Sequence, residues 1–259
     1  MKLQVIIRFL LLFFCLSMMV ASAKANMLKG IELYENRHLG SINNSASNQN
    51  INKAIKYFLN EMNNPEFEKE AALFLLKSYY YKGEFTTQEK QEKKMIFNKG
   101  KSLGEKYINK FPNSVAFRYW YLVNLGSWAQ VYGIFTAARE GVADIMKAHS
   151  ERIIQLDPEY EDGGGYFMLG AVHYKSPYIP FLLSWPNNND AIKYLQIALQ
   201  TGSKRLNQKV YLAKALIKNN QQQKAKILLL EVVSANPDSF HLVEELDEIN
   251  DAHKLLNNY

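Results

Sequence analysis

The sequence has few of the residues that cross-link small exported domains through disulfides or that form reactive sites. Its 259 residues include a single cysteine, Cys15, with only seven prolines and thirteen glycines. Cys15 lies inside an N-terminal apolar run, so the chain beyond that run holds no cysteine. This excludes disulfides, thiolate metal sites and a cysteine nucleophile there. The low proline and glycine content argues against a long disordered region.

Residues 1–25 have the three-part pattern of a secretory signal peptide. Two basic residues precede a continuous apolar run over 9–20, and small residues then offer overlapping cleavage sites after Ala23 and after Ala25. The apolar run is about 12 residues long, whereas a membrane-spanning helix needs roughly 18 or more. We therefore expect export to the periplasm, with retention of the segment as an anchor as the alternative. Cys15 lacks the small preceding residues of a lipobox, which predicts a soluble or peripherally attached protein.

Charge and histidine spacing exclude two further classes of function. Removal of the signal peptide takes away three of the 31 basic residues and leaves 28 against 25 acidic ones. The lysines are scattered among glutamates, so no basic stripe for nucleic acid is present. None of the five histidines forms an HxxxH or HExxH pair, and no acidic cluster has ligand spacing. We predict no catalytic residue, no metal and no cofactor, and hence a protein that is not an enzyme.

Helical periodicity dominates the chain, most clearly near its C-terminal end. Residues 206–217 and 225–233 each carry an apolar stripe at helical spacing. Ala213 and Ala225 lie 12 residues apart, and Pro237 follows after another 12, in register with the roughly 34-residue tetratricopeptide repeat. Small residues belong at those positions because larger ones would push the crossing helices apart. This spacing predicts a helical hairpin of the tetratricopeptide type.

The same pattern recurs upstream with insertions. We expect an all-α, tetratricopeptide-like helical-hairpin array, an α-α superhelix with inserted loops, over residues 51–259. It would contain about four hairpins and a closing helix from Phe240 to about Leu256. Residues 26–50 are expected to form an N-terminal segment with a linker at 43–50, which is rich in asparagine and serine. A stack of hairpins buries a continuous core and leaves a concave groove for binding.

Two irregular regions are candidate binding sites. The first is rich in aromatic residues and is expected either to fill the core between irregular repeats or to line an apolar cavity, with an arginine as counter-charge to an anionic ligand. Its candidate ligand-binding residues are Arg118, Trp120, Trp128, Tyr132, Tyr166 and Tyr174. The second is the proline-rich insertion over 176–189. We expect it to act as a lid or partner-binding loop through Phe181, Leu182 and Trp185, or to plug the core beneath it.

A run in the second half of the chain resembles a known family. It comprises Tyr160-Glu161-Asp162-Gly163-Gly164-Gly165-Tyr166-Phe167-Met168-Leu169-Gly170, followed by Tyr174, Pro177 and Pro180 and by Ala191, Leu195 and Ala198. This pattern is similar to the tetratricopeptide T component of TRAP transporters. The similarity is specific over roughly 157–240 and diffuse from about 50 to 156. Two features depart from the family: no arginine lies between the glycines and Leu169, and the lipobox is absent.

The resemblance implies a periplasmic scaffold that assists TRAP-type solute uptake. Such a protein would dock the solute-binding component of the system and hold a small apolar or carboxylate ligand. It would also self-associate into a homo-oligomer such as a trimer. The alternative is a general cell-envelope scaffold that helps to assemble an outer-membrane or secretion complex.

Overall fold

The computed structural model describes residues 22–181, 183–202 and 205–258. These residues are mostly helical, and turns and loops with two isolated β-bridges join the helices, which confirms the all-α expectation. Residues 1–21, most of the predicted signal peptide, and Leu182 of the predicted loop site lie outside the described residues. Within the described part, no helix is both long enough and apolar enough to cross a membrane.

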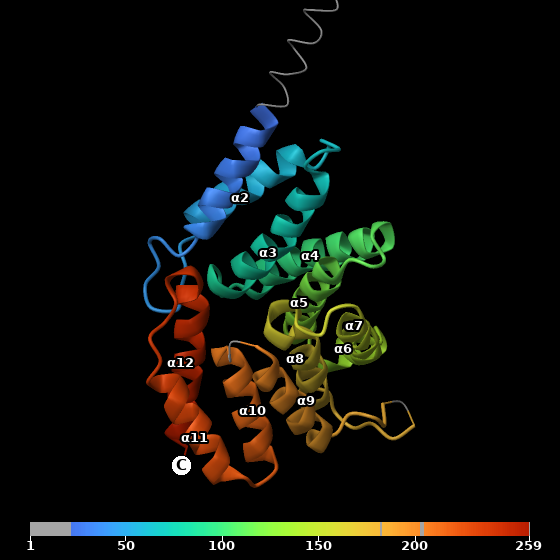
Figure 1. The fold of residues 1–259 in the computed structure, drawn as a ribbon, viewed down its shortest axis with the longest axis vertical. Coiled ribbons are helices and arrows are strands. Elements are labelled where there is room, and N and C mark those ends of the chain that lie inside the picture. Colours follow the sequence, from blue (N-terminus) through green and yellow to red (C-terminus); the bar gives the residue numbers. More distant parts are fainter. Residues whose placement is uncertain (1–21, 182, 203–204, 259) are drawn as a thin grey trace, which may run out of the picture.

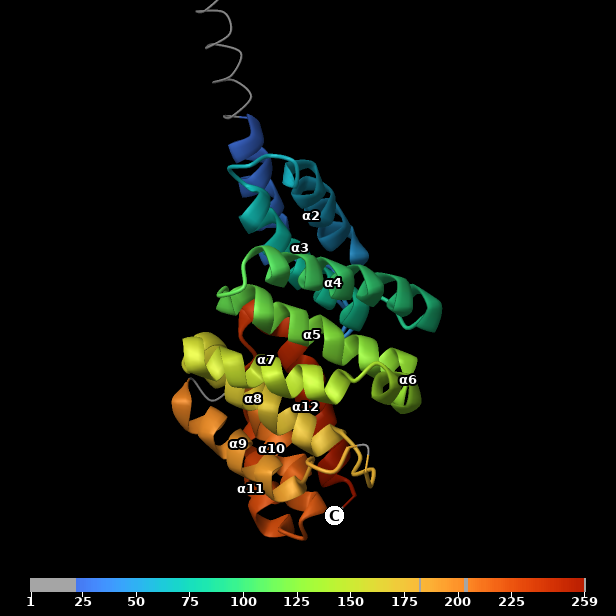
Figure 2. The same ribbon diagram turned by 90° about the vertical axis from the view of Figure 1, so that its right-hand side faces the viewer.

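Successive helices pair as antiparallel hairpins that stack along the long axis of the molecule (Figures 1 and 2). The helices are α2 (Asn48–Glu61), α3 (Glu68–Phe85), α4 (Lys90–Lys110), α5 (Val115–Tyr132), α6 (Ile134–Arg139), α7 (Val142–Leu156), α8 (Tyr160–Lys175), α9 (Asn188–Thr201), α10 (Leu206–Lys218), α11 (Gln222–Val233), the 3₁₀ turn η1 (Ser239–His241) and α12 (Leu242–Leu256). A further helical stretch over 22–35 precedes α2.

The predicted C-terminal hairpin is present as α10 and α11. Ala213 and Ala225 are fully buried where the two helices cross, as the repeat spacing requires. The hairpin ends at Ser234, and the predicted closing helix follows as η1 and α12. The sequence pattern was therefore sufficient for this part of the fold.

The N-terminal segment differs from the expected linker. The stretch 22–35 packs on α2 and α3, with Met27 buried beside Phe58 and a close contact at Gly30. Residues 48–50 already belong to α2, whose first turn is capped by the Ser47 hydroxyl. Residues 43–47 do connect two helices, but residues 48–50 of the expected linker lie in α2, since Ser47 caps that helix and the residues before it form turns.

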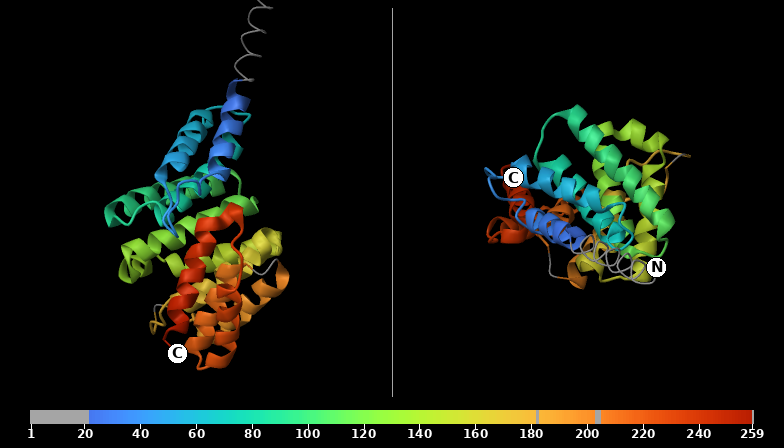
Figure 3. Two further views of the ribbon diagram at one scale, coloured as in Figure 1. Left: turned by 90° about the vertical axis from the view of Figure 1, so that its left-hand side faces the viewer. Right: turned by 90° about the horizontal axis from the view of Figure 1, so that it is seen from above.

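The C-terminal helix α12 closes the stack on itself. After α11 the chain crosses to the N-terminal hairpins, and α12 then runs back beside the inner helices to the C-terminal end (Figures 1 and 3). Val243 at its start is buried against Ala46, Ile51 and Tyr81, while Ala252 near its end joins the main core. The two ends of the superhelix are thus joined by one helix.

Candidate functional site

A concave groove of about 1100 Å³ runs along the inner face of the superhelix. The helices α3, α5, α8 and α10 supply its main wall together with α6 and the start of α7, and α12 and residues around Tyr34 close the opposite side. In most of these hairpins one helix faces inward and its partner packs outside, whereas both α5 and the start of α7 reach the groove. Side chains of α2, α4, α9 and α11 are accordingly not among the groove-lining residues of the described chain.

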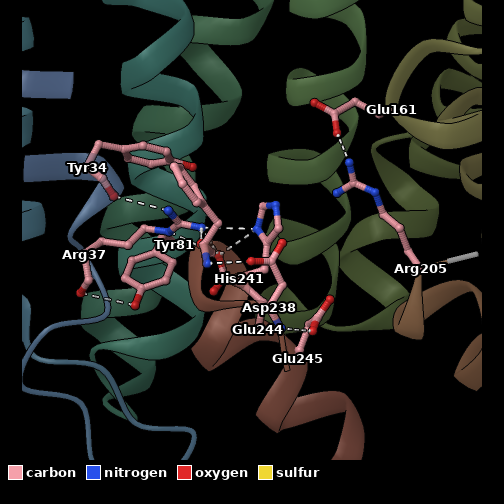
Figure 4. A network of polar contacts seen from close by, with 10 residues as sticks. Tyr34, Arg37, Tyr81, Glu161, Arg205, Asp238, His241, Glu244 and Glu245 are labelled. Atoms are coloured by element: carbon pink, nitrogen blue, oxygen red, sulfur yellow. Dashed lines mark hydrogen bonds and ion pairs between the residues drawn. The ribbon is translucent and has the colours of Figure 1, made fainter. Parts of the chain in front are cut away.

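A buried arginine, Arg37, lies on one side of the groove and pairs with Glu244 (Figure 4). We call this ion pair the Arg37 clasp. Arg37 is only 2% exposed, and its Nη2 lies 2.6 Å from Glu244 Oε1. The same nitrogen donates to the Phe240 carbonyl at 2.6 Å, and the guanidinium packs on the rings of Tyr34 and Tyr81. The hydrogen bonds of the guanidinium thus join the end of the 22–35 helix to the segment formed by η1 and α12.

The charges of the clasp stabilise each other. Burial by itself would raise the pKa of the Glu244 carboxyl, but His241 and Arg37 together hold that pKa below its ordinary value. The pKa of Arg37 is raised, since the neighbouring Tyr34 and Glu244 outweigh the opposing effect of burial. Both groups are therefore charged near neutral pH, as a buried ion pair requires.

On the other side of the groove lies the Arg205 cluster, formed by Arg205, Glu161 and Asp162 (Figure 4). Arg205 Nε lies 2.6 Å from Asp162 Oδ2, and Nη2 lies 3.0 Å from Glu161 Oε2. Gln208 donates to the Asp162 carbonyl at 2.7 Å. Glu161, Asp162 and Gly163 all have left-handed backbone, with φ of 50°, 57° and 79°. Because such φ values cost about 1–3 kcal/mol for a residue other than glycine, the cluster holds a strained turn in place.

Lys77 on α3 lies in the groove and is partly buried. Its Nζ lies 5.3 Å from the centre of the Trp120 ring and 5.4 Å from that of Phe74. It has no hydrogen bond or ion pair with any described residue. Burial lowers the pKa of Lys77, and the fields of Arg37 and Arg205 lower it further while Glu161 acts in the opposite sense.

The α12 side of the groove is acidic. Glu244, Glu245, Asp247 and Glu248 all line it, and acidic residues outnumber basic ones over the whole groove lining. Glu248 has no hydrogen bond within the described chain, and burial raises its pKa to about 7 although Lys214 lowers it in part. The groove thus combines aromatic surface, a half-buried lysine without a hydrogen bond to any described residue, and an acidic wall.

The predicted aromatic site is divided by the structure. Trp120 lines the groove, but Trp128 and Tyr132 stack on each other at 4.4 Å and share hydrogen bonds with Asn98 of α4. Arg118 donates to the Pro112 carbonyl and meets His149, away from the groove, so the expected counter-charge to a groove ligand is not this residue.

The two predicted tyrosines of α8 also lie outside the groove lining. Tyr166 and Tyr174 are partly buried against the main core, and Tyr174 packs near the ring of Tyr211. The other interpretation of the aromatic set is that it fills spaces between irregular repeats. This interpretation fits all of the aromatic candidates except Trp120.

The sequence left two interpretations of the proline-rich loop open, an exposed loop and a plug of the core, and each applies to a different part of it. Trp185 Nε1 donates to Asp144 of α7 at 2.7 Å and packs on His173, while Leu183 is buried at the groove edge. Phe181 is fully exposed, and so is most of Tyr178. One part of the loop therefore plugs the structure, and its tip faces solvent.

No sequence motif marks the basic residues of the groove. Arg37 falls in the N-terminal segment, for which the sequence predicts no binding residue, and Lys77 is one lysine among many on a helix. Arg205 follows a short turn and matches no motif. Their importance comes from contacts over about 40 to 200 residues, which helical periodicity does not encode.

Comparison with known proteins gives a family and a fold. Residues 33–182 match the family described as regulator of microtubule dynamics protein 1-3, which is more than half of the chain. A solved tetratricopeptide-repeat protein of Thermus thermophilus superposes with a TM-score of 0.62 at 13% identity, over 90% of this chain and 99% of that one. No curated protein matches the sequence significantly.

The resemblance to the T component of TRAP transporters is wrong, because the family match is to a different family. The glycines that carried it have a packing role. A side chain on Gly164 would lie 2.5 Å from the Tyr119 ring, and one on Gly170 would lie 2.6 Å from Leu195. Close helix crossings of this kind are general to tetratricopeptide arrays, so the glycine pattern is not specific to one family. The solute-binding partner expected from that resemblance loses its basis.

Proposed function

The chain belongs to the regulator of microtubule dynamics protein 1-3 family, and from this premise and its groove we propose that it is a protein-interaction scaffold. In this proposal the concave groove holds an extended segment of a partner protein, and the chain does no chemistry on it. The tetratricopeptide-like fold supports a scaffold role, since such arrays bind partners along their inner surface.

The observation that carries the proposal is the size and composition of the groove. Its roughly 1100 Å³ volume is continuous from α3 to α12, so an extended chain would contact several hairpins at once. Aromatic rings such as Trp120 and Tyr119 offer apolar contact, and charged groups lie at its edges. The arginines that could otherwise act on a substrate are already engaged in ion pairs that hold the helices together.

The location of this scaffold depends on residues 1–25. If they direct export as predicted, the partner is a component of the cell envelope, in line with the alternative of a general envelope scaffold. If they are retained, they would hold the groove near a membrane surface. Self-association stays a prediction, which sedimentation of the purified full chain would check.

The proposal is tested by photo-crosslinking in the native cell. A photoreactive amino acid replaces Gln130, an exposed residue of α5 that lines the groove, and in a matched control it replaces Ile227 on the outer face of α11. We expect crosslinks from position 130 to map to one short segment of a partner, with none of these from position 227.

Blocking the groove should remove that crosslink. Gly126 lines the groove, and a side chain there meets only Met146 at an ordinary 3.6 Å, so Gly126→Trp is expected to fold and fill the space. Ile227→Trp adds the same bulk outside. A crosslink that survives Gly126→Trp, or that forms equally from both positions, would contradict the proposal.

A further inference from the structure

We propose that Lys77 binds a carboxylate of the partner segment, namely an aspartate or glutamate side chain flanked by apolar residues. This inference rests on the proposed function and names the chemistry that the groove recognises. It also moves the counter-charge for an anionic group from Arg118, outside the groove, to the inner face of α3.

Lys77 is a cation that forms no ion pair with a described residue. An ammonium group that is partly removed from water loses hydration, and most such groups recover it through a carboxylate or carbonyl. Lys77 has neither among the described residues, and its Nζ instead lies over the faces of Trp120 and Phe74. The lowered pKa of Lys77 reflects the same shortage of stabilising partners.

The neighbouring acids are already committed elsewhere. Glu161 is the one carboxylate whose field stabilises the Lys77 charge, and it is paired with Arg205 at 3.0 Å. Arg37, whose field also reaches Lys77, is paired with Glu244. A carboxylate entering between the Arg37 clasp and the Arg205 cluster would therefore find Lys77 available, whereas both arginines are already paired with carboxylates of the protein.

A second groove lysine makes a useful contrast. Lys175 on α8 also lines the groove, and its Nζ lies 5.6 Å from the Tyr211 ring. It is more exposed to solvent than Lys77. Burial and then Lys214 lower its pKa, but Asp251, Glu248 and Glu84 all act to stabilise its charge. The protein itself supplies acidic surroundings to Lys175 but little to Lys77. The position suited to a ligand anion is therefore Lys77.

The surroundings of Lys77 also select the rest of the ligand. Phe74, Tyr80, Tyr119 and Trp120 line the same part of the groove, which favours apolar side chains on either side of the carboxylate. The acidic α12 wall opposes a ligand with many negative charges, such as a nucleic acid or an anionic membrane. A single carboxylate in an otherwise apolar, extended peptide satisfies both conditions.

The test uses defined peptides and the full-length protein. Short peptides of serine, leucine and tyrosine carry one aspartate at each position in turn, with capped ends, and a second set carries asparagine instead. A third peptide set has a free C-terminal carboxylate and no aspartate. Binding is measured by fluorescence anisotropy for wild type, Lys77→Met and Lys77→Arg. Lys94→Met is the matched control, because Lys94 also lies over an aromatic ring, Tyr132, without a carboxylate, but outside the groove.

We expect an aspartate peptide to bind wild type at least about tenfold more tightly than its asparagine counterpart, the size of one charge-assisted hydrogen bond. Lys77→Met should remove that preference, Lys77→Arg should retain part of it, and Lys94→Met should leave it unchanged. Circular dichroism of each variant checks that it is folded.

The other outcomes overturn the inference in distinguishable ways. Aspartate-peptide binding that Gly126→Trp abolishes and Lys77→Met leaves intact keeps the scaffold function but removes the Lys77 site. Binding of no peptide in any set overturns both proposals. Lys77-dependent binding of octanoate, of the free C-terminal carboxylate alone, or of phosphatidylglycerol vesicles, in place of the aspartate peptides, assigns the site to a different occupant and overturns this one.

Discussion

The Arg37 clasp and the Arg205 cluster face each other across the groove and use the same chemistry in different settings. Arg37 is 2% exposed and joins residues 207 positions apart, whereas Arg205 is 36% exposed and joins residues 43 and 44 positions apart. The first ion pair closes the superhelix, and the second stabilises one strained turn at the start of α8. The role of an arginine–carboxylate pair in the fold therefore depends on its burial and on the sequence separation that it spans.

The largest expected effect comes from breaking the Arg37 clasp. Arg37→Met leaves the Glu244 carboxylate buried without its cation, and such changes typically cost about 3–5 kcal/mol of unfolding free energy. The measurement is urea unfolding followed by circular dichroism. The double variant Arg37→Met/Glu244→Met is the control and should recover part of the loss, because no charge is then left unpaired. A loss below about 1 kcal/mol for Arg37→Met would show that the clasp is solvated and does not close the fold.

An intermediate effect is expected at Glu248, one turn after Glu244 on α12 but without an arginine. Burial raises the pKa of Glu248 to about 7, above its unfolded value, so the folded chain binds the proton more tightly. The stability contributed by this group is present at low pH and falls as pH rises from about 4.5 to about 7. Glu248→Gln should therefore raise the unfolding free energy by about 2 kcal/mol at about pH 8 and leave it unchanged at about pH 4.

Unfolding curves at the two pH values measure this effect. Wild type measured at the same two pH values is the control. An equal change at both pH values for Glu248→Gln would mean that packing, and not titration, is responsible.

The smallest expected effect is at the Arg205 cluster. Arg205→Met removes an ion pair that is about one-third exposed, so screening by water reduces its contribution to roughly 1 kcal/mol. The loss should shrink between about 0.05 M and about 0.5 M salt, because added salt shortens the Debye length. Arg205→Lys keeps the charge and should lose less. A loss as large as that of Arg37→Met would mean that the strained turn at Glu161 and Asp162 governs the stability of the whole array.

The parts of the fold that could be predicted from the sequence are those set by local spacing. The α10–α11 hairpin follows from apolar periodicity and from small residues at Ala213 and Ala225, both of which act between neighbouring helices. The sequence does not predict the N-terminal helix over 22–35, because the serines and asparagines that follow it favour a linker. In the folded protein those polar residues cap α2 and form turns.

The site was less predictable than the fold. Of the aromatic set chosen from sequence, Trp120 reaches the groove, because a helix rich in aromatics on all sides cannot reveal which side faces inward. Trp128 and Tyr132 are on the same helix and face α4 instead. Arg37 and Lys77 gain their roles from the return of α12 and the curvature of the stack, which depend on the whole chain. The glycines of α8 are similarly explained by close helix packing and not by membership of one family.

The return of α12 to the N-terminal hairpins limits how the number of hairpins in this array can change. In an open solenoid each hairpin contacts only its neighbours, so hairpins can be added or lost at little cost and can unfold one at a time. Here the last helix is bonded to the first hairpins through Arg37 and through Asn44, which donates to Asp247 at 2.7 Å. Insertion of one hairpin would move these partners apart. The closure therefore fixes the number of hairpins and the length of the groove, and we expect the array to unfold as one cooperative unit.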